Sequence, residues 1–425
     1  MVYHADMKDV FLKLIDEFRQ SKIPAYYRRD FPQVPIDSNK MITLMGPRRA
    51  GKSTFMYQLM DDLVRQQVPA KCIFYFNIED DRLNGLKSEE LDDLLAACRE
   101  RAAAPLEDCY FFFDEVQQLP LWDKFLRRVY DTISTHLFVT GSNARLLSKE
   151  IPTHLRGRSL SFSIMPFTFA QYCDFKQVNT PLTIDVLSFL RFGGFPEVVK
   201  QDNDLLKIRI LQEYFDVMVY RDLIERHKMR MPQVLKPFVQ ALAASAGKLF
   251  SVLSVFGRLK GAKVEVSKNT LYKYLETCQS AYVVEAVEKY HTKVVLRKAG
   301  ERKVYLVDSG YLTALNPRED LGTKLEHAVY WQLRYQMEMM DEIYFFKEAV
   351  ECDFVIKQKN QWTAIQVAYD LSDPKTTARE VKGLTTACKS FGLKAGWIIT
   401  IAEKKTVKEK GIVIHYVPFG EWARE

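Results

Sequence analysis

The sequence has no apolar run of the length that a membrane span needs, which is about 20 residues. Its first residues also lack the basic segment and following apolar segment of a secretory signal. No internal repeat and no tract of low complexity occurs in the 425 residues. These absences argue against a membrane, secreted or disordered protein, and we expect a cytoplasmic one.

Cysteine is scarce and scattered. The seven cysteines are an odd number, and no two of them have the spacing of zinc ligands. Because disulfides are disfavoured in the cytosol, we interpret all seven as reduced, structural residues.

What is present describes a folded protein of several domains. Hydrophobic residues make up 47% of the chain and charged residues 27%, which is typical of globular proteins. Short apolar runs at 41–45, 72–77, 110–113, 137–140 and 159–164 alternate with helical patterns. Strands that are apolar on both faces are typical of a parallel sheet in an α/β fold. The pattern changes at Pro166.

We therefore predict an α/β protein whose first domain holds a parallel sheet, followed by a winged helix and a small α/β domain. The predicted domains are the α/β core at 1–165, a helical lid or linker at 166–230, the winged helix at 231–315 and the last domain at 316–425.

A glycine-rich loop follows the first predicted strand and matches the pattern GxxxxGK[ST]. In such loops the backbone amides surround the phosphates, the lysine reaches the β- and γ-phosphates, and the hydroxyl binds Mg²⁺. The loop lies between a predicted strand and a predicted helix, which is the context this motif requires. We predict an ATP site formed by Gly46, Pro47, Arg48, Arg49, Ala50, Gly51, Lys52, Ser53 and Thr54.

Two carboxylates, Asp114 and Glu115, follow the apolar run at 110–113. They should emerge at the carboxyl edge of the sheet, where α/β folds bind ligands. We predict that Asp114 holds Mg²⁺ together with Ser53, and that Glu115 polarises the attacking water. Since binding alone does not need the second carboxylate, the pair favours hydrolysis.

Two further catalytic candidates follow the next strand. Asn143, with Ser142 as the alternative, could orient the water, although a tight turn would use the same residues. Arg158 could act as an arginine finger on a neighbouring subunit, with an ordinary surface role as the alternative. The finger role predicts a homo-oligomer, with a hexamer as one candidate.

Positive charge gathers between residues 251 and 303, where 11 Lys and Arg stand against 5 Asp and Glu. Between residues 231 and 300, three helical segments precede strand-like patterns at 282–290 and 293–297, which together describe a winged helix. A basic cluster on such a domain indicates DNA binding, and a solvated basic face is the alternative. We predict contacts, mainly to the DNA backbone, from Lys268, Asn269, Tyr272, Lys273, Lys293 and Arg297.

Several motifs resemble, in order, those of the prokaryotic AAA+-like ATPases of the "archaeal ATPase" type. They are the loop at 46–54, Phe112–Val116, Thr140–Asn143, Leu155–Arg158, Pro166–Phe169, Gly193–Glu197 and Tyr220–Leu223. The resemblance implies a P-loop NTPase core of the AAA+ kind, a winged helix and a C-terminal α/β domain of unknown function with a fold similar to PD-(D/E)xK nucleases.

The nuclease motif itself is incomplete. Glu326 and Asp353 remain, but the Glu-x-Lys position reads Gln366-Val367-Ala368. Losing one carboxylate should weaken the binding of a hard cation, so we expect no cutting activity.

Two functions stay open. The first is an ATPase that couples hydrolysis to DNA binding or remodelling. The second is a nucleotide-dependent switch or scaffold whose partner is a protein.

Overall fold

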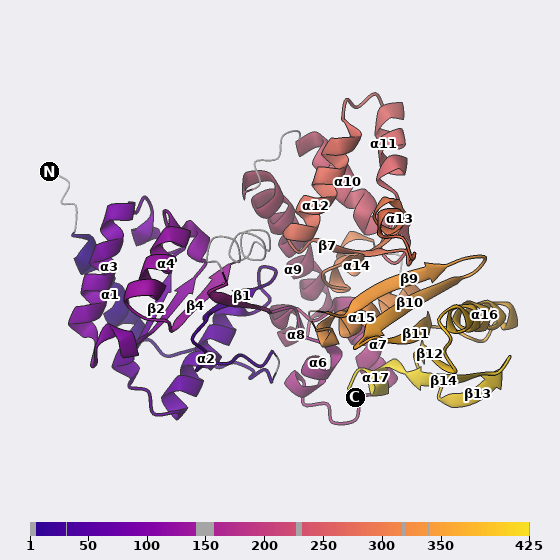
Figure 1. Ribbon diagram of the computed structural model, residues 1–425, viewed down its shortest axis with the longest axis horizontal. Coiled ribbons are helices and arrows are strands. Elements are labelled where there is room, and N and C mark those ends of the chain that lie inside the picture. Colours follow the sequence, from indigo (N-terminus) through magenta and orange to yellow (C-terminus); the bar gives the residue numbers. More distant parts are fainter. Residues whose placement is uncertain are drawn as a thin grey trace. The chain divides into compact units, whose positions relative to one another are not determined.

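The computed structural model describes residues 6–30, 32–141, 157–226, 232–316, 320–338 and 340–424. The chain forms two compact units, which meet in sequence between Met165 and Pro166, and each is described by itself (Figure 1). Among the described helices, none is both long and apolar enough to cross a membrane.

The first unit is built on a parallel five-stranded sheet with the order β2-β3-β4-β1-β5. Its strands are β1 Met41–Met45, β2 Ile73–Asn77, β3 Tyr110–Asp114, β4 Leu137–Gly141 and β5 Ser159–Ser163. Its helices are α1 Met7–Gln20, α2 Lys52–Arg65, α3 Leu91–Arg101 and α4 Trp122–Thr132. The predicted α/β fold with a parallel sheet is thereby confirmed.

Helices cover both faces of this sheet because successive strand residues point to opposite sides. Phe112 belongs to the core cluster that includes α2, whereas the ring of Phe113 meets Phe125 of α4 edge-on, with 5.9 Å between the centroids. All five residues of β1 are buried. Strand β1, which lies between β4 and β5, therefore leads into the loop and α2 from the interior of the sheet.

The second unit begins with helices α6 Phe169–Phe175, α7 Thr183–Phe192, α8 Pro196–Lys200 and α9 Asp204–Val217. A π-helical segment, Met218–Arg226, continues α9. The turn at Gly193 and Gly194 is held by Asp308, which lies over a hundred residues away: its Oδ2 accepts a hydrogen bond of 2.8 Å from the Gly194 amide. Residues 166–226 thus pack into the same compact unit as the described residues that follow them.

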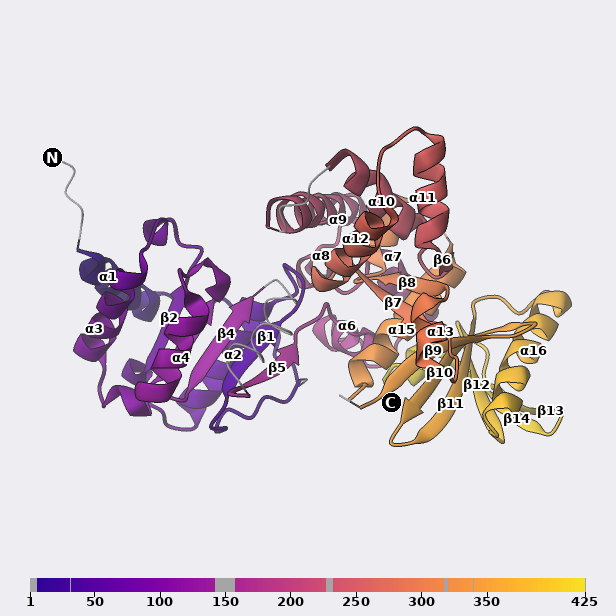
Figure 2. The same cartoon turned by 45° about the horizontal axis from the view of Figure 1, so that its top comes forward.

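A three-stranded antiparallel sheet follows, with the order β6-β8-β7. It consists of β6 Leu249–Phe250, β7 Val284–Glu288 and β8 Arg302–Leu306. Helices α10 Pro232–Ala244, α11 Val252–Gly261 and α12 Lys268–Ser280 gather beside it (Figure 2).

The prediction of a strand at 293–297 is wrong. Those residues belong mostly to a short helix, α13 Val294–Ala299, and the strand that pairs with β7 is β8. A run of a few apolar residues, here Val294, Val295 and Leu296, does not by itself distinguish helix from strand.

The last part of the chain is a mixed six-stranded sheet with the order β13-β14-β12-β11-β10-β9. Its elements are α14 Gly310–Leu315, α15 Leu321–Gln336, β9 Glu342–Lys347, β10 Glu351–Gln358, β11 Gln361–Ala368, α16 Pro374–Ser390, β12 Ala395–Thr400, β13 Lys405–Glu409, β14 Ile412–Pro418 and α17 Phe419–Trp422. Strands β9, β10 and β11 are antiparallel, and β11, β12 and β14 are parallel.

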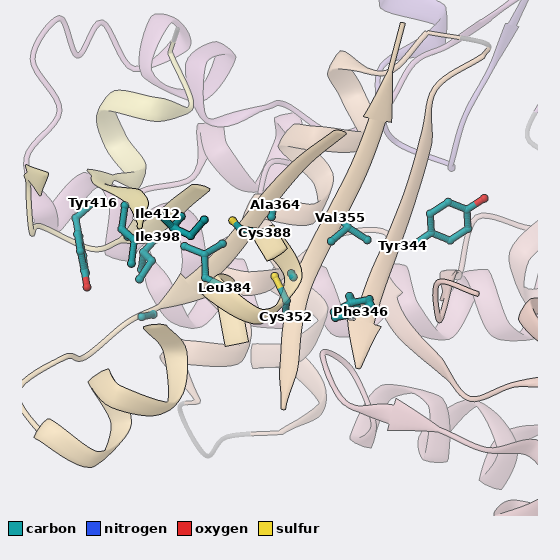
Figure 3. Close-up of a cluster of buried hydrophobic side chains, with 13 residues drawn as sticks. Tyr344, Phe346, Cys352, Val355, Ala364, Leu384, Cys388, Ile398, Ile412 and Tyr416 are labelled. Carbon is teal, nitrogen blue, oxygen red and sulfur yellow. The ribbon is translucent and has the colours of Figure 1, made fainter. Parts of the chain in front are cut away.

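Helix α16 covers one face of this sheet. Figure 3 shows its Leu384 and Cys388 beside Cys352, Ala364 and Ile398 of the strands, in one buried apolar cluster. All seven cysteines of the chain are free and buried, in agreement with the structural role expected for them.

Candidate nucleotide site

The glycine-rich loop at residues 46–53 joins β1 to α2, so its two ends are held by a buried strand and a 14-residue helix. Gly51 is the N-cap of α2, with φ of 93° in the left-handed region that glycine adopts without strain. Because glycine has no side chain to cap the helix, the first amides of α2 are left for a ligand, and the helix dipole favours an anion there.

Gly46 lies where no other residue fits. Its φ is 152°, and a Cβ built on it would lie 1.9 Å from the carbonyl oxygen of Ile164. The amide of Ile164 also donates to the carbonyl of Met45 at 2.6 Å. This glycine therefore lets the loop pass directly against the chain that leaves β5.

Lys52 is buried and bends back over the loop. Its Nζ donates to the carbonyls of Gly46 at 3.1 Å and Pro47 at 3.0 Å, and lies 4.0 Å from Oε1 of Glu115. The ammonium group and the candidate general base thus share one site, although 63 residues separate them in sequence.

Asp114 ends β3 and is 4% exposed. Its Oδ1 accepts a short hydrogen bond from Oγ1 of Thr140 on β4, and its Oδ2 accepts one of 2.9 Å from the hydroxyl of Tyr75 on β2. Burial and the charge of Asp114 raise the pKa of Tyr75 well above its ordinary value, so the tyrosine stays a donor. Neighbouring strands therefore fix the orientation of this carboxylate.

Glu115 turns away from the strand with φ of 54°, a left-handed conformation that is uncommon outside glycine. Its amide donates to Oγ1 of Thr140 at 2.9 Å, and its carboxylate accepts a hydrogen bond from Nε2 of Gln117. Thr140 thus holds both acidic residues at once.

Oxygen ligands are available for a hard cation, since Ser53 lies in the first turn of α2 and Asp114 lies at the carboxyl end of β3. Carboxylate and hydroxyl oxygens are the ligands that Mg²⁺ takes beside phosphates. The residues present therefore fit an Mg·ATP complex.

Sequence reasoning missed Arg29, which braces the loop from outside. Its guanidinium donates to the carbonyl of Ala50 at 2.6 Å and to that of Met165 at 2.7 Å, and the residue is 5% exposed. Gln58 of α2 binds the backbone amide and carbonyl of Arg29 at 2.9 and 2.7 Å. The only sequence signal was the pair Arg28-Arg29 ahead of the first strand.

Of the further catalytic candidates, only Arg158 lies within the described residues. Asn143 and its alternative Ser142 lie outside the described residues. Arg158 is described, and its Nε donates to Oδ1 of Asp131 at 2.8 Å while its guanidinium lies 6.0 Å from the ring centre of Tyr130. Within one subunit, Arg158 therefore has a surface ion pair.

The predicted DNA contacts fall into two groups. Lys268, Asn269, Tyr272 and Lys273 are exposed on α12, whose N-terminus is capped by Ser267. Lys293 is exposed just before α13.

Arg297 differs from these residues. Its guanidinium lies 5.2 Å from the ring centre of Tyr344 in β9 and donates to the tyrosine hydroxyl. Arg297 thus joins α13 to the six-stranded sheet.

Comparison with known proteins agrees with the site. Residues 38–173 match the family model of an AAA domain, and residues 185–322 match a domain of unknown function, DUF8612. The uncharacterized protein MJ1544 of Methanocaldococcus jannaschii is 31% identical over 98% of this chain and 96% of its own length.

Two other similarities are weaker. An uncharacterized protein of Haemophilus influenzae is 27% identical over 79% of this chain and 84% of its own length. Among solved structures, the Walker-type ATPase PABY2304 of Pyrococcus abyssi covers 74% of this chain and 96% of its own, at 14% identity and a TM-score of 0.41. The full-length similarity to MJ1544 defines the family.

Proposed function

This chain belongs to the same protein family as MJ1544 of Methanocaldococcus jannaschii, and we propose that its AAA domain binds Mg·ATP and hydrolyses it. The observation that carries the proposal is the meeting of Lys52, Asp114 and Glu115 at the end of β3. Lys52 lies 4.0 Å from Glu115, and Thr140 binds both carboxylate residues.

Each residue has a role that follows from its place. The amides of residues 46–54 and the dipole of α2 bind the phosphates, and Lys52 neutralises the β- and γ-phosphates. Ser53 and Asp114 hold Mg²⁺, which neutralises the charge that develops on the phosphates. Glu115 accepts a hydrogen bond from the attacking water and orients it.

The Glu115→Gln variant tests this assignment. It should bind ATP as the wild type does but lose at least about a hundredfold in turnover, since a positioned base contributes about 10²–10⁴-fold. Glu107→Gln makes the same chemical change at an exposed position and serves as the control. Turnover by Glu115→Gln within a fewfold of the wild type would remove Glu115 from the mechanism.

We propose that Arg158 completes the site of a neighbouring subunit in a homo-oligomer. Its guanidinium would leave Asp131 to reach the γ-phosphate of the neighbour. Arg158→Lys keeps the charge but loses the planar fork, so it should lower turnover without weakening ATP binding. Mixing it with Glu115→Gln should restore activity, because some sites would then combine an intact base with an intact arginine; no recovery would argue against a shared site.

For the second unit we propose a winged helix that binds DNA. The order α10, β6, α11, α12, β7, β8 and the pairing of β8 with both other strands support this topology. The exposed side chains at the start of α12 have the chemistry of a recognition helix, with lysines for phosphates and Asn269 and Tyr272 for hydrogen bonds.

The double variant Lys268→Ala, Lys273→Ala should weaken DNA binding and lower the slope of log affinity against log salt by about two, because two phosphate contacts are lost. Lys382→Ala with Lys389→Ala removes the same charge from exposed positions on α16 and is the control. Fluorescence anisotropy of a labelled duplex at several salt concentrations measures both. Equal affinity of the two double variants would refute this DNA surface.

One observation favours the second function, a switch that binds a protein. Val294, Val295 and Leu296 of α13 are 52%, 77% and 49% exposed, and Leu253 of α11 is 52% exposed. Exposed apolar residues in a group are typical of protein interfaces. Stimulation of ATP turnover by duplex DNA separates the two functions: a DNA-coupled ATPase accelerates several-fold, and a protein switch does not respond.

For the last domain we propose a nuclease-like fold without cutting activity. The order α15, β9, β10, β11, α16, β12 supports the fold, and Gln366 and Ala368 stand where the motif needs Glu and Lys. Cleavage of DNA with Mn²⁺ that disappears in Asp353→Ala would overturn the second half of this proposal.

A further inference from the structure

A lysine lies buried among carboxylates in the second unit. Lys303 of β8 has a side chain that is 2% exposed, and its Nζ lies 2.9 Å from Oε1 of Glu326, 2.9 Å from Oε1 of Glu351 and 2.8 Å from Oδ1 of Asp353. The three acids come from α15 and β10, while the lysine comes from the three-stranded sheet. One ammonium group thus joins two parts of this unit.

The acids around Lys303 are held in place by their own partners. Oδ2 of Asp353 accepts a hydrogen bond of 3.0 Å from the amide of Val367, and the hydroxyl of Tyr305 donates to Oε1 of Glu326 at 2.7 Å. The amide of Asp353 donates to Oε1 of Gln366 at 3.1 Å. Hydrogen bonds from the protein therefore orient these carboxylate oxygens without the help of a cation.

An ammonium group suits this arrangement of oxygens. It has three N–H donors, and three carboxylates lie at hydrogen-bond distance from it. Burial disfavours the charged form, but Asp353, Glu326 and Glu351 outweigh that effect and raise the pKa of Lys303 well above its ordinary value. The carboxylates thus hold the lysine in its charged form.

A divalent ion cannot share this position. Mg²⁺ takes ligands at about 2.0–2.1 Å and would need the space that Nζ fills. In the described part of the chain, no three His, Cys, Asp or Glu side chains are arranged to hold a metal ion. The carboxylates that a nuclease would use for its metal are directed at the lysine.

We propose that the ammonium group of Lys303 replaces a divalent cation in this carboxylate cluster, and that it ties β8 to α15 and β10 without any metal. The cluster is then a structural set of ion pairs that connects these elements. Its function does not depend on the ATP site, and it explains physically why the domain needs no metal.

The cleft beside this cluster agrees with such a role. It has a volume of about 680 Å³, and its charged lining residues are Glu326, Glu351, Asp353, Asp370, Glu380 and Arg379. Even with Arg379 and the neighbouring Lys303 counted as cations, these five acids leave an excess of negative charge that repels the phosphates of DNA when no divalent cation is present. The DNA contact proposed above is therefore expected on another surface of the unit, such as α12.

The test uses Mn²⁺ alone with nucleotide-free, full-length protein, and electron paramagnetic resonance counts the bound ions. The wild type and Asp353→Asn should bind Mn²⁺ equally, because the cluster holds none. Lys303→Met removes the ammonium and leaves an unbranched side chain of similar length. It should gain one Mn²⁺ per chain, and Lys303→Met with Asp353→Asn should lose that ion again.

Two results would overturn the proposal. One is a wild-type Mn²⁺ site that disappears in Asp353→Asn. The other is a folded Lys303→Met protein, checked by circular dichroism, that gains no ion. If Lys303→Met does not fold, the comparison of wild type with Asp353→Asn decides, and equal binding supports the proposal.

Discussion

Arg29 offers the sharpest test of how the nucleotide loop is held. Its guanidinium donates to the carbonyls of Ala50 and Met165 at 2.6 and 2.7 Å, and the residue is buried. Hydrogen bonds to a charged donor contribute about 1.5–3 kcal/mol each. We therefore expect Arg29→Met, which keeps an unbranched side chain but removes the guanidinium, to destabilise the first unit by about 3 kcal/mol.

The neighbouring residue provides a matched control. Arg28 forms an ion pair with Asp62, but its side chain is 41% exposed. Pairs of this kind contribute about 0–1 kcal/mol because water and salt screen them. Arg28→Met removes the same charge and should have little effect.

Hydrogen exchange measures the difference in stability between the two variants within the first unit. The slowest amides of β1 and α2 report the opening of the first unit, and a loss of about 3 kcal/mol lowers their protection about a hundredfold. ATP affinity should fall as well, because the carbonyl of Ala50 is no longer tied. Equal protection in Arg29→Met and Arg28→Met would refute the reasoning, since the two carbonyl contacts would then contribute nothing.

Two further predictions concern single positions. Gly46→Ala should abolish ATP binding in a titration, because its Cβ would lie 1.9 Å from the carbonyl oxygen of Ile164. The control is Gly85→Ala, where φ is 81° and no atom lies within 4 Å of the new Cβ. It carries only backbone strain of about 1–2 kcal/mol and should still bind ATP. Burial raises the pKa of Asp308 from 3.8 to about 6, which corresponds to roughly 3 kcal/mol in favour of the protonated carboxyl. This stability is present below about pH 4 and lost as the pH rises through about 6. The free energy of unfolding in urea should therefore fall over that pH range in the wild type but not in Asp308→Asn. A fall of the same size in the variant would assign the effect to other groups.

The glycine-rich loop could be recognised from the sequence because its signals are local. The loop needs glycines at fixed spacing, a strand before it and a helix after it, and all three can be recognised within about 25 residues of sequence. Strands with continuous apolar runs, such as 110–113, indicated a parallel sheet. The rule that ligands bind at the carboxyl edge of such a sheet predicted that Asp114 and Glu115 emerge at that edge. The distance of 4.0 Å between Lys52 and Glu115 came from the structure.

The wrong strand at 293–297 shows the limit of local patterns. A short apolar run fits a helix or a strand equally, and the choice here depends on which strand pairs with β7. That pairing, with β8, involves residues nearly twenty positions further along. Strand pairing is a contact between distant segments, so no periodicity reveals it.

The amino-acid sequence by itself thus determined the α/β class and indicated the glycine-rich loop at residues 46–53. Only the tertiary structure showed which distant residues hold the segments in place. These contacts are Arg29 with Ala50, Asp308 with Gly194, and Lys303 with its three carboxylates. The contact between Asp308 and Gly194 spans 114 residues, and that between Lys303 and Asp353 spans 50. A buried charge needs a partner in space and not in sequence, because the free energy of burying it depends on the atoms around it once the chain has folded.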